Sequence, residues 1–436
     1  MYRWLFRVVL IFFSLSTGVL SKDYDLKQIL HLAETHNRDI QLAKAQLQIA
    51  SAEKLSAYSQ AIPKISLNGG YNRNFLENIF YFRINDQIQS FKTSFRNEFS
   101  FNAILSQTLF SYKVGVAIQA AKYFSRMTNY QYETTRNMVL TQVKKAFYRA
   151  LLLQEVYRVA KDSEESAHEN YLNIKAKFES GLVSEFDLLQ AEVRWQNAIP
   201  ETIKARKDVE LALNQLKIMS GIPLNEEVTL SGQLEIFPPL PAAVQDESIT
   251  QTHPEIAALI WEKKLREKNV TAQKANFFPS LNANLQYTYR AASDRFRLEQ
   301  DNDNIILGIS LQVPVFSGGN NIAQVRKARA EVDIVKAQLN KTRDNIRIQL
   351  RNVLLRLQEA RQRIDAARHG VETAQRAYEI ALTRVNNQLA TQVELKENRV
   401  ALDRAQLNYY SAIFDYLDSY FDWQYVTGHV STDESF

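Results

Sequence analysis

Four segments of this 436-residue chain alternate apolar and polar side chains with a period of two. In the third segment, apolar residues from Leu281 to Tyr289 take the odd positions and polar residues from Asn282 to Arg290 take the even positions. This alternation predicts β-strands with one face in an apolar medium and the other face in water. The four predicted strands are about 64–75, 91–110, 281–291 and 304–316.

A half-buried sheet on a soluble core and a sheet in a bilayer would both give this alternation. The segments reach ~10 residues, which is the length of a tilted membrane strand. Polar stretches at 76–90 and 292–303 join the strands and suit external loops. Because even the smallest barrels need about eight strands, four membrane strands require oligomerisation. Aromatic residues gather toward one end of the strands, where a membrane-interface girdle would lie: Tyr71, Phe75, Phe91, Phe95, Tyr287 and Tyr289.

Two stretches, 112–179 and 319–386, contain no proline and predict helices ~100 Å long at about 1.5 Å per residue. In the second stretch, apolar residues recur at spacings of three and four, which is the pattern of a coiled-coil seam. Two successive steps of four, from Thr342 to Leu350, are a stutter that locally unwinds the supercoil. Shorter helices, stacked end to end beside the long ones, are expected at 26–60, 184–220, 256–276 and 391–427.

The same order of elements occurs twice. The turns that begin at Ser180 and Asn387 are 207 positions apart, and the same offset relates Gly221 to Gly428. Self-similarity at a fixed offset indicates a duplicated architecture. We therefore expect a first repeat at 22–221, a linker at 222–250, a second repeat at 251–428 and a tail at 429–436, with long helical hairpins at 112–220 and 319–427.

Residues 1–21 have the pattern of a secretory signal peptide, with Arg3 and Arg7 before an apolar run and small residues after it. The apolar run is shorter than the ~20 residues that a membrane anchor needs. The net charge is +5, of which these two arginines supply +2, so the remainder is nearly neutral and argues against a nucleic-acid partner. The absence of cysteine excludes disulfides, cysteine-based zinc sites and an N-terminal lipidated cysteine.

The sequence contains no nucleophile elbow, phosphate-binding loop, dinucleotide fingerprint or H-E-x-x-H motif, and its 6 histidines are scattered. We therefore expect no enzyme, cofactor or metal site.

The chain resembles the TolC-like family of outer-membrane efflux proteins, also called outer membrane factors, over essentially its whole mature length. The resemblance rests on the duplication, the strand ends Gln107–Phe110 and Val313–Gly319, and the turn Phe178–Leu189. It implies an α+β membrane protein, a homotrimer whose four strands per chain form a 12-stranded β-barrel in outer-membrane lipid. It also implies a long α-helical coiled-coil barrel in the periplasm and an equatorial region that includes the proline-rich stretch 237–241.

The function that the resemblance implies is passive efflux of drugs, metal ions or other small molecules. The partners it implies are a periplasmic adaptor (membrane fusion) protein and an inner-membrane pump of RND, ABC or MFS type. One alternative is the exit duct of a type I protein secretion system. An alternative from a different class is an exported coiled-coil structural protein whose strands form a soluble sheet.

The resemblance also suggests a pore constriction. Glu394 and Glu397 follow the second turn at a spacing that places them on one helix face, and a trimer would stack them as two carboxylate rings. Asp187 and Gln190 are their counterparts in the first copy. The candidate adaptor-docking tip consists of Gly181, Leu182, Val183, Gln388, Leu389 and Ala390.

The chain departs from the family at the second turn. Asn387-Gln388 stands where a glycine is usual, so we expect Asn387 to take the left-handed conformation there. Val385 and Ala390 occupy the positions of a tyrosine and an arginine that latch relatives shut, so that latch is not expected.

Overall fold

The structure is a computed structural model that describes residues 22–84, 86–241, 253–387 and 389–432. The predicted signal peptide (1–21), residue Gln388 and part of the linker lie outside the described residues. The described chain divides into two compact units. The first comprises 22–43, 133–241, 253, 344–387 and 389–432, and the second comprises 44–84, 86–132 and 254–343.

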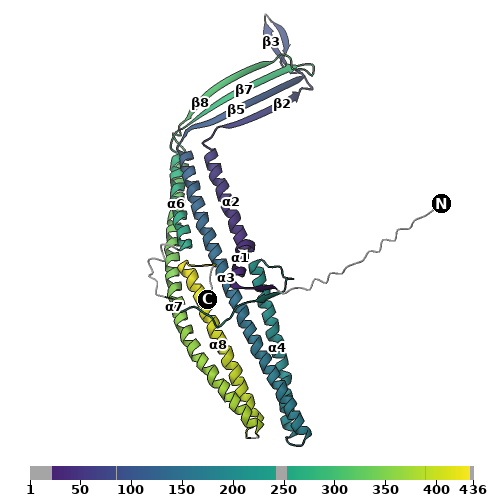
Figure 1. Ribbon diagram of the computed structural model, residues 1–436. Helices are drawn as coiled ribbons and strands as arrows, with labels where there is room; N and C mark the ends of the chain where they lie inside the picture. The colour runs from purple at the N-terminus through teal and green to yellow at the C-terminus, as the bar shows by residue number, and fades with distance from the viewer. Residues whose placement is uncertain (1–21, 85, 242–252, 388, 433–436) are drawn as a thin grey trace, which may run out of the picture. The chain divides into compact units, whose positions relative to one another are not determined.

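Two copies of one order of elements follow each other along the chain (Figure 1). The first copy contains α1 (Leu26–His36), α2 (Arg38–Ser59), β2 (Lys64–Arg73), β5 (Asn97–Ser111), α3 (Tyr112–Glu179) and α4 (Glu185–Ser220). The second copy contains α6 (Pro254–Ala275), β7 (Ser280–Ser293), β8 (Asn302–Gln312), α7 (Asn320–Asn386) and α8 (Gln392–Thr427). Four short strands are additional: β1 (Lys22–Tyr24), β3 (Ile79–Ile84), β4 (Gln87–Lys92) and β6 (Val228–Leu230).

The copies correspond closely in their helix ends. The helices α4 and α8 each have 36 residues. They end at Gly221 (φ 76°) and Gly428 (φ 75°), two left-handed caps that a residue without Cβ adopts at little cost. The predicted duplication is confirmed.

One predicted helix is wrong. Residues 26–60 were expected to form a single helix, but the chain breaks at Asn37. The Asn37 side-chain oxygen accepts hydrogen bonds from the backbone N–H of Asp39 (2.9 Å) and Ile40 (3.3 Å), and so caps α2. Its amide donates to the Met219 carbonyl oxygen at 2.8 Å, which joins this break to the end of α4.

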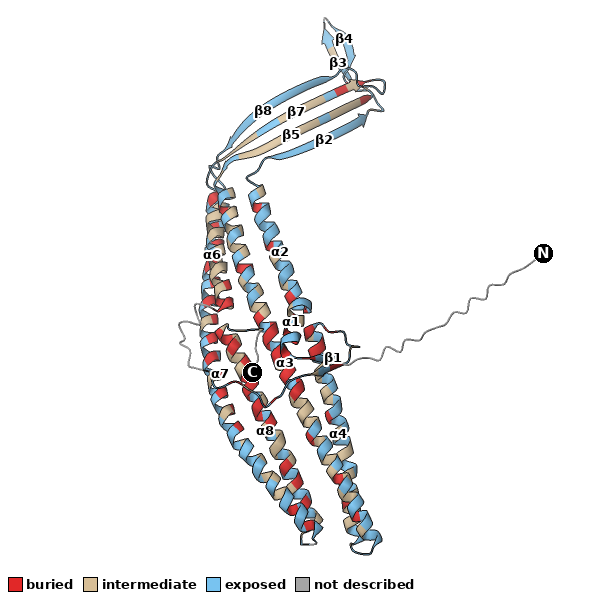
Figure 2. Ribbon diagram, in the orientation of Figure 1, coloured by how far each residue is buried: buried red, intermediate tan, exposed pale blue. Residues whose placement is uncertain are grey.

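The second unit contains a four-stranded antiparallel sheet in the order β2-β5-β7-β8. Its register places Leu67, Ala103, Tyr287 and Ile305 in one row, with Asn68, Asn102, Thr288 and Asn304 in the next row on the opposite face. The predicted alternation therefore separates an odd-numbered apolar face from an even-numbered polar face. Both edge strands, β2 and β8, are exposed along their length (Figure 2).

The predicted start of the second strand, at residue 91, is wrong. The strand β5 begins at Asn97, and β3 and β4 pair with each other as a separate two-stranded sheet where a polar loop (76–90) was expected. The Phe91 ring packs on Phe80 and Phe82, with ring centroids 5.6 and 5.7 Å away. Phe91 and Phe95 share the odd-numbered apolar parity of β5, so the parity alone does not show where β5 begins.

In the first unit, α3 and α8 contribute side chains with almost no exposure, including Leu140, Phe147, Ile413 and Phe421. The Tyr416 hydroxyl donates to the Pro238 carbonyl oxygen at 3.0 Å, which attaches the proline-rich stretch to α8.

Within the residues that the structure describes, no helix has an apolar run long enough to cross a membrane. The seam predicted on α7 is buried through the stutter, at Val332, Val335, Leu339, Thr342, Ile346, Leu350, Val353, Leu357, Ala360 and Ile364.

Gly181 and Gly221 are both left-handed, but we expect alanine to destabilise the protein to different extents at the two positions. A Cβ at Gly221 would lie 2.4 Å from the His36 Cβ, whereas a Cβ at Gly181 (φ +74°) would meet nothing within 4 Å. Gly181→Ala should therefore cost only the backbone strain, about 1–2 kcal/mol. Gly221→Ala should cost clearly more and lower the apparent melting temperature of the detergent-purified protein further. Equal melting temperatures for the two variants would contradict the close approach of α1 to the end of α4.

Candidate functional site

The first turn, between α3 and α4, is closed by local hydrogen bonds. The Leu182 N–H donates to the Lys177 carbonyl oxygen at 2.9 Å around the left-handed Gly181. The Ser184 hydroxyl donates to the Asp187 carboxylate at 2.6 Å, and the Asp187 N–H donates back to the Ser184 oxygen at 3.3 Å. Asp187 is therefore engaged in a capping box at the start of α4.

The second turn, between α7 and α8, has the same backbone closure, because the Leu389 N–H donates to the Arg384 carbonyl oxygen at 2.8 Å. Thr391 caps α8 by accepting from the Glu394 N–H at 3.2 Å. Among the described residues, the non-glycine positions with positive φ are Asp86 and Gln300, so the expectation that Asn387 is left-handed is wrong. The counterpart of Gly181 at the offset of 207 is Gln388, which lies outside the described residues.

The two candidate glutamates differ in their surroundings. The Glu394 carboxylate accepts from the Arg384 guanidinium at 2.7 Å, and the same guanidinium donates to the Leu389 carbonyl oxygen at 3.2 Å. Glu397 is exposed and makes no ion pair within the described part of the chain. Within one protomer, the negative charge of Glu397 is therefore less compensated than that of Glu394.

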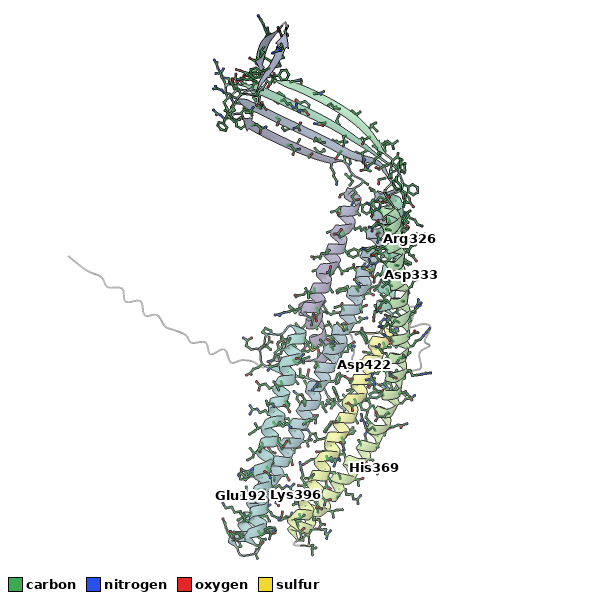
Figure 3. All side chains as sticks on the ribbon, turned by 180° about the vertical axis from the view of Figure 1, so that it is seen from behind. Glu192, Arg326, Asp333, His369, Lys396 and Asp422 are labelled. Atoms are coloured by element: carbon green, nitrogen blue, oxygen red, sulfur yellow. The ribbon has the colours of Figure 1, made fainter. Side chains whose placement is uncertain are left out.

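Gln190 lies in a groove of about 490 Å³ between α3, α4 and α8, which does not include Asp187, Glu394 or Glu397. The structure thus does not bring the four candidate constriction residues together within one protomer. Figure 3 shows Lys396 and Glu192 near the same end of α8 and α4. The groove is lined by Asn170, Phe186, Leu189, Gln190, Ala191, Val193, Arg194, Asn197, Gln392, Val393 and Lys396.

The tip residues are largely accessible. Leu182 and Leu389 are 63% and 69% exposed, and Val183 is half-buried. Ala390 packs against a small cluster formed by Ala381, Val385 and Leu395. Val385 and Ala390 are thus part of an apolar contact between α7 and α8. These are the two positions at which the family latch was not expected.

A buried polar cluster, which the sequence analysis missed, joins the helices of this unit above the tip. The Arg399 side chain is 9% exposed and its Nε lies 2.8 Å from an Asp403 carboxylate oxygen. The Ser163 hydroxyl on α3 donates to the other Asp403 oxygen at 2.8 Å, and the Arg399 guanidinium lies 5.4 Å from the Tyr378 ring centre on α7. The i, i+4 spacing of Arg399 and Asp403 was the available signal.

Burial governs the electrostatics of this cluster. Desolvation raises the pKa of Asp403, although the neighbouring Arg399 acts in the opposite direction. Desolvation also lowers the pKa of the nearby Arg194 guanidinium. Both shifts indicate that the charges are held in a poorly solvated environment.

The described residues contain no group of three or more His, Cys, Asp or Glu side chains placed to hold a metal ion.

A duplicated chain with a four-stranded sheet and long antiparallel helix pairs has the architecture of an outer-membrane channel protomer. Residues 29–221 and 247–420 match the family described as "Outer membrane efflux protein". The chain belongs to that family. The TolC-like resemblance drawn from the sequence is confirmed, and so is the expected fold class.

Individual relatives agree with this assignment. The chain is 26% identical to the alkaline protease secretion protein AprF of Pseudomonas aeruginosa over 55% of this chain and 52% of AprF, so the match spans about half of that relative. It is 22% identical to the outer membrane protein TolC of Vibrio cholerae over 73% of this chain and 72% of TolC. Among solved structures, the Campylobacter jejuni CmeC outer membrane channel is similar, with a TM-score of 0.79 at 21% identity, covering 94% of this chain and 87% of CmeC.

The buried pair predicts a strong asymmetry between single and double substitutions. Asp403→Leu leaves the Arg399 charge buried without its carboxylate and should destabilise the protein by about 3–5 kcal/mol. The double variant Arg399→Leu/Asp403→Leu should recover most of that loss, because no buried charge remains. Thermal unfolding followed by the helical circular dichroism signal measures both. If the double variant melted as low as the single one, the pair would be stabilising in its own right.

Proposed function

We propose that three copies of this chain form an outer-membrane channel-tunnel, which passively conducts cargo from the periplasm to the cell exterior. The observation that carries the proposal is the four-stranded sheet, which has one apolar face, one polar face and two long edges without a partner among the described residues of the protomer. Three such sheets supply twelve strands, which is enough to close a barrel.

The edges give the physical reason for assembly. The edge strands β2 and β8 have 10 and 11 residues, and a long open edge is a template for pairing with another chain. In a bilayer the requirement is stricter, because each backbone group without a hydrogen bond costs several kcal/mol. Pairing β2 of one copy with β8 of the next satisfies both edges and leaves none open. An exported coiled-coil protein with a soluble sheet would leave the odd-numbered apolar face uncovered.

In the assembled trimer, the odd-numbered face contacts lipid and the even-numbered face lines a water-filled lumen. The long helices continue the passage into the periplasm, and the turns at 180–184 and 387–391 form its inner end. Glu394 and Glu397 follow the second turn in the sequence, and Arg384, which pairs with Glu394, precedes it. We propose this end as the constriction.

The same end offers a docking surface for a periplasmic adaptor protein. Leu182 and Leu389 present exposed apolar side chains at the two turns. The groove lined by Gln190, Gln392 and Lys396 lies beside them in the same unit and adds polar groups. An adaptor bound here would connect the tunnel to an inner-membrane pump, which supplies the energy that a passive conduit lacks.

A second candidate cargo is a secreted protein. AprF, which is 26% identical to this chain over 254 residues, is an alkaline protease secretion protein. The cobalt-zinc-cadmium resistance protein CzcC of Cupriavidus metallidurans, 23% identical over 53% of this chain and 54% of CzcC, favours small-molecule or ion efflux instead. Because the pump selects the cargo in either case, the channel proposal holds for both.

The lipid-facing assignment predicts opposite effects at neighbouring residues of β7. Leu285 lies mid-strand on the apolar face, and Asn284 lies on the polar face. Leu285→Arg should reduce the stability of the trimer in membranes by about 2–4 kcal/mol, whereas Asn284→Arg should be tolerated in the aqueous lumen. Survival of heat-resistant trimers on gels measures the difference. Equal damage from both substitutions would mean that the two faces do not meet different media.

The experiment that tests the channel itself is conductance of the purified trimer in planar bilayers. We expect a small cation-selective conductance that trivalent metal ions block from the periplasmic side, because carboxylates at a narrow entrance attract cations. Glu397→Gln should lower the cation-to-anion permeability ratio toward one. The matched variant Glu394→Gln frees Arg384 as well, and should lower selectivity further. Absence of conductance would refute the channel, and unchanged selectivity in both variants would place the constriction elsewhere.

A further inference from the structure

The polar face of the four-stranded sheet carries two large apolar side chains, Ile104 on β5 and Ile306 on β8. Every other residue paired in register on this face is polar, charged, glycine or alanine. Polar side chains on this face also bond across the strands, because the Thr288 hydroxyl donates to the Asn102 side-chain oxygen at 2.9 Å. Two isoleucines facing water on a polar wall need a physical reason.

Both isoleucines belong to a single cross-strand row. The register aligns Ser66, Ile104, Gln286 and Ile306, which we call the isoleucine row. Neighbouring strands lie about 4.8 Å apart, so the two isoleucines are ~10 Å from each other. The Gln286 amide donates to the Thr288 hydroxyl at 3.1 Å and is therefore directed along β7 toward the next row. Ser66 is small, and Ile306 is 53% exposed, so the row presents apolar surface.

Positive charge lies on both sides of the isoleucine row. Lys64 is two residues before Ser66 on β2 and diagonal to Ile104, a separation of about 7–8 Å that its long side chain can cross. Arg290 lies two rows away on the other side. The Glu98 carboxylate is three rows away and already accepts a hydrogen bond from the Asn74 side chain at 2.8 Å. The surroundings of the row therefore complement an anion.

We propose that the isoleucine row is a binding site for amphiphilic anions, which place an alkyl or aryl body against Ile104 and Ile306 and an acid group beside Lys64. The proposal rests on the proposed function, because it requires the even-numbered face to line the lumen. Burial of an alkyl chain against two side chains yields weak binding, which suits a conduit because the cargo must also leave. A trimer with threefold symmetry places three copies of the row at the same depth around the lumen wall.

The test uses the purified trimer in planar bilayers, with octanesulfonate added on the extracellular side as the probe. We expect reversible block of the wild-type current. The double variant Ile104→Ser/Ile306→Ser should raise the half-blocking concentration roughly tenfold, because most of the apolar contact is removed. Lys64→Gln should raise it as well. Methanesulfonate, with the same acid group and no chain, should not block, and octyltrimethylammonium should block less than octanesulfonate.

A matched control keeps the test specific. Asn102→Ser/Asn304→Ser changes two residues on the same two strands and the same face, one row away, and should leave the octanesulfonate block unchanged. Equal block of the wild type and the double isoleucine variant would overturn the proposal while leaving the channel intact. Equal block by the cationic probe would overturn the anionic specificity. A wild-type trimer without conductance would overturn the channel and the site together.

Discussion

The unsatisfied backbone groups at the two edges of one four-stranded sheet constrain the whole protein. The edge strands β2 and β8 expose N–H and C=O groups along 10 and 11 residues. In hydrocarbon these groups have no water to bind, so they can be satisfied only by another copy of the same edges. The sheet can therefore enter a bilayer only as part of an oligomer. Once the sheets close into a barrel, one face meets lipid and the other meets water, which explains why one face is apolar and the other polar.

The long helices also depend on neighbouring segments, and here side chains rather than backbone groups make the contacts. A helix of 67 residues such as α7 cannot bury its apolar seam alone, and α8 has only 36 residues. The chain places polar contacts beside this seam: Ser163 and Ser166 of α3 bond Asp403 and Tyr378, each at 2.8 Å. Such contacts require specific partners, and so they favour one alignment of the helices over others that would bury the same apolar area.

The sequence predicted those parts of the fold that arise from contact with two different media or from local chain geometry. Strand parity followed from the alternation, and helix length followed from the absence of proline. The break at Asn37 was missed because the apolar spacing continues across it, although asparagine is a common helix cap. The start of β5 was missed because Phe91 and Phe95 share the odd-numbered apolar parity of β5, although they precede it.

The candidate site was predictable only where its partners are close in sequence. The Ser184–Asp187 capping box could have been derived from its spacing of three. The ion pair between Arg384 and Glu394 spans a turn, so its formation depends on the exact closure of that turn. The bond from Ser163 to Asp403 connects residues 240 positions apart, and no local pattern indicates it. The isoleucine row became visible only once the register of four strands was known.

The two turns at the end of the helices, similar in backbone, are held by different forces. At the first turn, Ser184 and Asp187 bond each other within one helical turn, and this contact depends little on the surrounding solution. At the second turn, the carboxylate of Glu394 is held by Arg384, a half-exposed ion pair that dissolved salt screens over about 8–10 Å at physiological ionic strength. Around a trimeric ring, hairpins insensitive to ionic strength would therefore alternate with hairpins that loosen as it rises. The ionic strength of the periplasm would then act on one repeat of the duplicated chain and spare the other.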